Sequence, residues 1–263
     1  MPTGHYIPNF DSEGALVKHT LSHASLDGKW QGVYEQSAIQ HFPIGTRLQL
    51  HDRTFYYCKA AGTTAVAMKA GHNSVADLGV NTDAVDYAAG ETEIVVLDTN
   101  TRAANYYQNG YVWVMNLVSG VYQMLKIKSS DAAAAADNKV TIQLYDPLPF
   151  AIPASTFVTI WPNPFSAITF TTSAYSAMMC VPLIPVTDTY YFWGQTWGPC
   201  FGTAMSAIPG AASADREVYF NGDGALIAGV DTVLETQVPQ RAGFIITMTS
   251  GGGDQFYMLQ ITP

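Results

Sequence analysis

The chain is dominated by short runs of alternating aromatic and β-branched residues, joined by turns that contain glycine. The clearest pair of runs is 111–117 and 121–128, which flank the short connection Val118-Ser119-Gly120. Two β-forming runs on either side of a glycine-containing turn predict a β-hairpin. Because the same pattern recurs along most of the chain, we expect antiparallel sheets to dominate the fold.

The remaining strands follow from the same pattern. Two further hairpins are predicted: residues 45–50 and 54–59 around His51-Asp52-Arg53, and residues 244–248 and 256–261 around the glycines at 251–253. Single strands are predicted at 93–97, 140–145, 156–160, 167–171, 189–197, 217–220 and 225–230. The strand at 189–197 is expected to end at Gly198-Pro199. Short strands at these spacings are typical of an all-β sandwich or barrel-like fold.

A few segments depart from the strand pattern. A short helix is conceivable at 26–39, a loop or short helix is expected at 60–90, and a short Asp-capped helix is expected at the alanine-rich 131–137. Residues 1–44 hold four of the six histidines and show no sustained period, which predicts an extended N-terminal arm. We therefore expect an arm at 1–44, a main β domain at 45–205 and C-terminal hairpins at 206–263, which either join the main domain or form a small second one.

The chain carries few charges for its length. Charged residues make up 13% of the 263 residues, against about 25% in a typical soluble domain. An uncharged exterior of this kind indicates that neighbouring subunits cover much of the surface, although a stable monomer could have the same composition. We expect a homo-oligomer, and a trimer is the favoured form.

The net charge of −9 argues against direct binding of nucleic acid, which requires clustered lysine and arginine. Residues 1–5 lack the basic and apolar regions of a signal peptide, and no apolar run approaches the length needed to cross a membrane. We expect a soluble protein that is made in the host cytoplasm and has neither nucleic acid nor a membrane as its partner.

The sequence lacks the motifs that are typical of catalysis or metal binding. No Gly-x-Ser-x-Gly elbow is present, and His19 and His23 lack the intervening glutamate of a zinc protease motif. Cys58, Cys180 and Cys200 form no Cys-x-x-Cys pair and lie in or beside apolar runs, which favours buried thiols. We therefore expect no catalytic residue, no metal site and no cofactor, and hence a protein that is not an enzyme.

The run from Tyr190 to Trp197 has two interpretations. Its aromatic rings could form a platform that stacks on sugars, but both faces of the strand could equally be buried in a core or subunit contact, which we favour. Aromatic anchors usually dominate the energy of an interface. The predicted interface residues are Tyr6, Ile7, Phe10, Trp30 and Tyr34 in the arm, with Tyr191, Trp193 and Trp197 in the strand.

Several segments, taken in order, resemble a family of tailed-bacteriophage virion proteins. The segments are His41-Phe42-Pro43-Ile44-Gly45-Thr46-Arg47, residues 52–60, Gly110-Tyr111-Val112, residues 122–128, Leu144-Tyr145-Asp146-Pro147 and residues 191–200. The resemblance spans roughly residues 40 to 205 and does not extend beyond them. It rests on aromatic and turn residues, and the genes of that family typically lie among capsid genes.

This resemblance implies a structural component of the virion. The expected role is a capsid decoration or cement protein, which binds the major capsid protein or other virion subunits and stabilises the phage head. One alternative is a protein that assembles with itself into a shell or tube, since low charge and abundant small residues suit both roles. The other alternative is a glycan-binding surface module that uses the aromatic strand.

Overall fold

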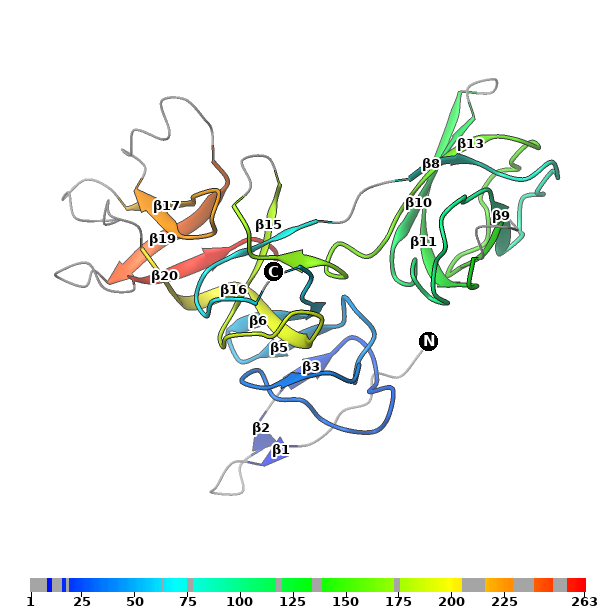
Figure 1. Cartoon of the computed structure of the whole chain (residues 1–263). Coiled ribbons are helices and arrows are strands. Elements are labelled where there is room, and N and C mark those ends of the chain that lie inside the picture. The colour runs from blue at the N-terminus through cyan, green and yellow to red at the C-terminus, as the bar shows by residue number, and fades with distance from the viewer. Residues whose placement is uncertain are drawn as a thin grey trace. The chain divides into compact units, whose positions relative to one another are not determined.

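The chain folds into β structure throughout the part that the structure describes. The computed structural model describes residues 9–10, 16–17, 19–62, 64–74, 78–116, 120–133, 139–172, 176–204, 216–228, 239–247 and 255–263, with side chains from residue 21 onward. Every regular element within these ranges is a strand, and the named strand pairs are all antiparallel (Figure 1). The prediction of an all-β fold of antiparallel sheets is thus confirmed, and the sheets are curled.

The chain divides into two compact units. Unit 1 consists of Met1–Ser74 and Phe165–Pro263, and unit 2 is the continuous segment Val75–Pro164. Unit 2 is therefore inserted into the chain of unit 1. This division cuts the chain at different places from the sequence-based boundaries at 44 and 205, because the chain leaves unit 1 after Ser74 and returns to it only at Phe165.

Unit 2 is a six-stranded sheet that curls until its edges meet. Its strands are β8 (Leu78–Asn81), β9 (Glu93–Val96), β10 (Tyr111–Asn116), β11 (Val121–Ser130), β12 (Val140–Leu144) and β13 (Phe157–Trp161), in the order β8-β13-β10-β11-β12-β9. Asp83 N donates to Val95 O at 3.0 Å and Leu97 N donates to Asn81 O at 2.8 Å, which links the two ends of the sheet. The predicted hairpin is present, with Tyr111 opposite Lys126 and Asn116 opposite Val121.

Alternation along the strands of unit 2 produces its core. In β10, Val112 and Val114 are fully buried while the residues beside them are only partly covered. The inward residues of the other strands, such as Ile127, Ile142 and Ile160, complete one continuous apolar cluster. Side chains therefore fill the interior of this barrel-like unit, and its strands present the alternate residues outward.

Unit 1 is built around one large antiparallel sheet. Its described strands are β3 (His19–Leu21), β4 (Gln36–Ser37), β5 (Arg47–Leu50), β6 (Arg53–Lys59), β7 (Gly71–Asn73), β14 (Ile168–Thr169), β15 (Met178–Pro182), β16 (Tyr191–Gly202), β17 (Glu217–Phe220), β18 (Leu226–Ala228), β19 (Arg241–Thr247) and β20 (Gln255–Gln260). The predicted β5–β6 hairpin is present, and β17 to β20 continue the same sheet rather than forming a second one. A separate two-stranded ribbon pairs β1 (Asn9–Phe10) with β2 (Leu16–Val17).

The long strand β16 holds the sheet of unit 1 together. Its first half pairs with β6 and its second half pairs with β20, and the register shifts between Gln195 and Trp197. The predicted end of this strand at Gly198-Pro199 is wrong, because the strand changes partner there instead of ending. Gly198 has φ +98°, and a Cβ on it would lie 2.5 Å from Asp52 O, so only glycine allows this bend.

The helices considered from the sequence are not found in the described residues. Residues 26–39 form turns and the short strand β4, since the side chains of Ser25 and Asp27 bond the local backbone around Lys29 and Gly28 adopts φ +74°. Residues 60–90 contribute β7 and β8. Of the alanine-rich stretch, residues 131–133 are not helical, and residues 134–138 lie outside the described ranges, as do the glycines at 251–253.

Part of the predicted arm belongs to the core of unit 1. Phe42 is fully buried, and Leu21 and Val33 join the same apolar cluster as Trp193 and Tyr57. β3 pairs with β5, and β4 pairs with β16. From residue 21 onward the segment is thus packed structure of unit 1.

Candidate functional site

The predicted interface residues lie in different surroundings. Tyr6 and Ile7 fall outside the described residues, and only the backbone of Phe10 is described. Trp30 is partly exposed and meets Phe42 edge-on, with ring centroids 6.0 Å apart. Trp197 is half-buried where β16 changes partner. The structure therefore does not bring this set together into one surface.

The aromatic strand is buried on both faces along most of its length. Trp193 is 1% exposed and Phe192 is fully buried on the opposite face. Tyr191 is half-buried and stacks on Tyr57, with ring centroids 6.0 Å apart and ring planes inclined by 8°. Of the two interpretations of this run, burial within the core of the chain describes these side chains, and the described strand offers no open row of rings to a sugar.

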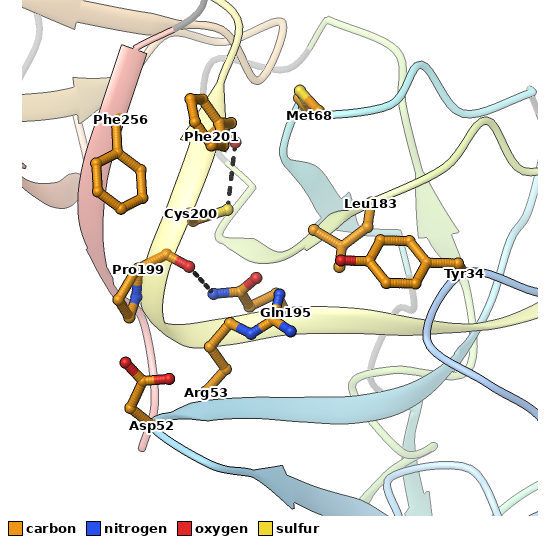
Figure 2. A pocket seen from close by; sticks show the side chains of 10 residues that line it. All are labelled: Tyr34, Asp52, Arg53, Met68, Leu183, Gln195, Pro199, Cys200, Phe201 and Phe256. Carbon is orange, nitrogen blue, oxygen red and sulfur yellow. Dashed lines mark hydrogen bonds between the residues drawn. The ribbon is translucent and has the colours of Figure 1, made fainter. Parts of the chain in front are cut away.

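A pocket in unit 1 is a first candidate site. Its volume is about 310 Å³, and it lies beside the point where β16 changes partner. Figure 2 shows the side chains that surround it, which come from the 51–53 turn, from β16 and β20, and from the loops that carry Tyr34, Met68 and Leu183. The full lining is Tyr34, Asp52, Arg53, Met68, Leu183, Gln195, Pro199, Cys200, Phe201 and Phe256. Of these, Tyr34 is 63% exposed.

Gln195 provides a fixed polar group in this pocket. Its Nε2 donates to the carbonyl oxygens of Trp197 at 3.1 Å and Pro199 at 2.9 Å, which the register shift leaves available. These contacts fix the orientation of the amide, which lies in the middle of the lining side chains in Figure 2. Gln195 Oε1 is buried and accepts no hydrogen bond from the described residues. Gln195 is 0% exposed, so protein atoms cover this acceptor completely.

The charges around the pocket come from the 51–53 turn. The Arg53 guanidinium lies 5.3 Å from the centre of the Phe55 ring, and none of the described ion pairs includes it. The Cys200 thiol faces the pocket, and burial raises its pKa to about 12, although Tyr257 and the positive charge of Arg53 act in the opposite direction. The thiol is therefore protonated at neutral pH and acts as an apolar wall.

Unit 2 presents a second candidate site on the outside of its sheet. Tyr122 and Met124 on β11 are 56% and 67% exposed, and Phe157 on β13 is 41% exposed. Trp113 stacks on Tyr122, with ring centroids 6.1 Å apart and planes inclined by 26°. We call the outward apolar residues of β10, β11 and β13 the outer aromatic face: Tyr111, Trp113, Met115, Tyr122, Met124, Phe157 and Trp161.

The outward side chains on the other strands of unit 2 are mostly polar or charged. On β12 and β9 the outward side chains are polar except for Val95, and Gln143 Nε2 donates to Glu93 Oε2 across the strands. Lys126 and Lys128 continue the outward row of β11, and Lys126 Nζ lies 5.0 Å from the centre of the Tyr111 ring. The outer aromatic face is thus confined to one side and has a positive rim in a chain of net charge −9.

The described residues contain free thiols but no cluster of metal ligands. No group of three or more His, Cys, Asp or Glu among them could hold a metal ion, and no helix in the described ranges is long and apolar enough to span a membrane. All three cysteines are free and buried. Cys58 Sγ lies 3.7 Å from Cys180 Sγ, above Gly194, where the strand has no side chain.

Comparison with known proteins adds no relative. No protein-family model matches the chain. No curated protein and no solved structure matches it. Its function is therefore argued from the two candidate sites.

Sequence reasoning did not identify either site. The outer aromatic face could have been found from the run 121–128, in which Tyr122 and Met124 alternate with Leu125 and Ile127. Because aliphatic residues occupy the alternate positions, the Tyr and Met positions are the outward ones. The pocket had no comparable signal, since it joins Arg53 to Gln195 and Tyr34 through the pairing of β6 with β16.

Proposed function

We propose that the chain is a structural protein of a bacteriophage virion, and that it binds the outside of the head as a decoration or cement protein. The observation that carries the proposal is the outer aromatic face of unit 2. Monomeric proteins rarely expose contiguous apolar patches of this kind unless they bind a partner. The sequence resemblance of residues 40 to 205 supports the choice of a virion partner.

The chemistry of the face indicates what it would contact. Tyr, Trp and Met are enriched in the centres of protein interfaces, and lysines are typical of the rim. Since Lys126 and Lys128 flank the face, a matching surface on the major capsid protein would be apolar with acidic residues beside it. Repetition of the contact over a symmetric head would multiply a modest affinity through avidity. The proposal requires no catalytic residue and no cofactor.

Removing the exposed side chains of β11 tests this proposal. We expect the double variant Tyr122→Ser/Met124→Ser to bind empty phage heads at least about tenfold more weakly than the wild type, because central interface residues each carry more than about 1 kcal/mol. Co-sedimentation with heads that lack the protein measures the affinity. The matched control is Thr141→Ala/Gln143→Ala on the polar side of the same unit, which should bind normally. Undiminished binding by the first variant would refute the assignment of this face.

The oligomeric state separates decoration from self-assembly. We propose a discrete homo-oligomer, with a trimer favoured, because few charges remain to cover a monomer. Light scattering gives the mass, and electron microscopy of the same sample shows whether regular density is added to heads. Long tubes or closed particles formed by the protein alone would favour the shell-forming alternative. An inert monomer would contradict both structural roles.

A further inference from the structure

The sheet of unit 1 presents an apolar surface of its own on the outside of β16, β20 and β19, which lie next to one another (Figure 1). Phe201, Phe244 and Ile246 are 48%, 38% and 43% exposed. Strand pairing places Phe201 opposite Phe256, and Phe244 opposite Met258. We call the following residues the apolar face of unit 1: Pro199, Phe201, Phe244, Ile246, Phe256 and Met258.

The side chains of this face form one continuous surface. The rings of Phe201 and Phe256 touch across the strands, with centroids 5.0 Å apart and planes inclined by 33°. Cys200, Tyr257 and Ile245 alternate with the members of the face and point into the core of unit 1. Contiguous exposed apolar residues of this kind are typical of a surface that binds a partner.

The charged residues that lie beside this face occur as opposite pairs. On the β17 side, Arg241 Nε donates to Glu217 Oε1 at 3.2 Å. On the β16 side, Asp52 and Arg53 line the pocket that Phe201 also lines. Each pair sums to zero, although the whole chain has a net charge of −9.

We propose that the apolar face of unit 1 binds a second copy of this chain. Two copies of net charge −9 repel each other, and the repulsion is weakest where the charges beside the contact cancel. Contact between copies also adds an attraction, because Arg241 of one copy can meet Glu217 of the next around a symmetry axis. A strongly acidic or basic partner would find no net opposite charge here. A second copy thus suits both the apolar residues and the charges.

This inference rests on the homo-oligomer proposed above and assigns its contact to unit 1. Head binding is assigned to the outer aromatic face of unit 2, so the two contacts use different residues. Trp197, one of the interface residues predicted from the sequence, pairs with Gln260 beside the apolar face of unit 1. Of that predicted set, Trp197 is the described residue that this contact would include.

Removal of two exposed rings is the first test. We expect Phe201→Thr/Phe244→Thr in the full-length protein to raise the dissociation constant of the oligomer at least about tenfold, because apolar residues at the centre of an interface dominate its affinity. Threonine is chosen because it favours strands. The control is Val85→Thr/Phe150→Thr, which removes exposed apolar side chains from unit 2 outside the outer aromatic face and should leave the constant unchanged. Sedimentation velocity over a dilution series measures the constant, and circular dichroism checks the fold.

Charge reversal at the exposed ion pair is the second test. Glu217→Arg makes both members of the pair cationic, and Arg241→Glu makes both acidic. Each variant alone should associate at least about tenfold more weakly than the wild type, because like charges then meet between copies. An equimolar mixture of the two variants should associate more tightly than either alone, since opposite charges meet again. Damage to the fold of one chain would not be repaired by mixing.

The outcomes separate the contact from the oligomer. A monomeric wild type would overturn both. An oligomeric wild type would keep the proposed oligomer, and either an unchanged constant in Phe201→Thr/Phe244→Thr or no recovery on mixing would then overturn the contact alone. If the apolar double variant does not fold, the mixture of charge variants decides.

Discussion

Replacing Trp193 with alanine is expected to lower the free energy of unfolding by about 3–5 kcal/mol, the usual cost of truncating a buried tryptophan. The indole is 1% exposed and packs against Phe42 and Tyr57, with centroid distances of 5.2 and 4.9 Å. Its Nε1 also donates to Gln31 O at 2.8 Å. The substitution therefore leaves a cavity and an unpaired carbonyl together.

Two further variants make this result specific. Trp193→Phe keeps most of the ring contacts but loses the hydrogen bond to Gln31, so it should cost about 1–2 kcal/mol. Trp113→Ala removes the same residue type from the outer face of unit 2 and should cost about 1 kcal/mol or less. Urea unfolding followed by circular dichroism measures all three. A loss below about 1 kcal/mol for Trp193→Ala would contradict the core position of this residue.

The strands were predictable because their information is local. The runs that contain β10 and β11 alternate between inward and outward residues over seven or eight positions. The register of the two strands follows from the short connection between them. The β5–β6 hairpin was found for the same reason. A local pattern of this kind gives the existence of a strand and its nearest partner, and hence the fold class.

The boundaries of the units and the sites depend on contacts between distant residues. Gln31 Nε2 donates to Tyr191 O, a residue 160 positions away in the sequence. Because of contacts of this kind, part of the predicted arm packs in the core of unit 1. Gly198 has the sequence signal of a strand end, but in the structure it allows β16 to bend where its partner changes from β6 to β20. The pocket arises at that switch, so no single segment could have predicted it.

The buried carboxylate of Asp98 should be the main electrostatic determinant of the stability of unit 2. It accepts hydrogen bonds from Tyr107 Oη at 2.7 Å and from Arg102 Nε at 3.1 Å. Asn100 donates to its other oxygen from both the backbone and the side chain. Burial alone would raise the pKa of Asp98, but these hydrogen bonds outweigh it and hold the pKa below its ordinary value.

We expect Asp98→Asn to destabilise the protein by about 3 kcal/mol at pH 7, because an amide cannot accept from all of these donors and leaves Arg102 without its partner. The control is Asp146→Asn, an exposed position, which should change the free energy of unfolding by less than about 0.5 kcal/mol. Urea unfolding at neutral pH compares the two variants with the wild type.

The pH dependence of this effect has a definite sign. A carboxyl whose pKa is lowered by folding contributes its full stabilisation above the unfolded value of about 4, and loses it as the pH falls through the folded value. The difference in unfolding free energy between the wild type and Asp98→Asn should thus be constant from pH 7 to about 5 and shrink below about pH 4. Urea titrations at pH 7, 5 and 3 measure this difference, which cancels the contributions of other carboxylates. A difference that stayed constant at pH 3 would mean that Asp98 acts through the shape of its side chain and not through its charge.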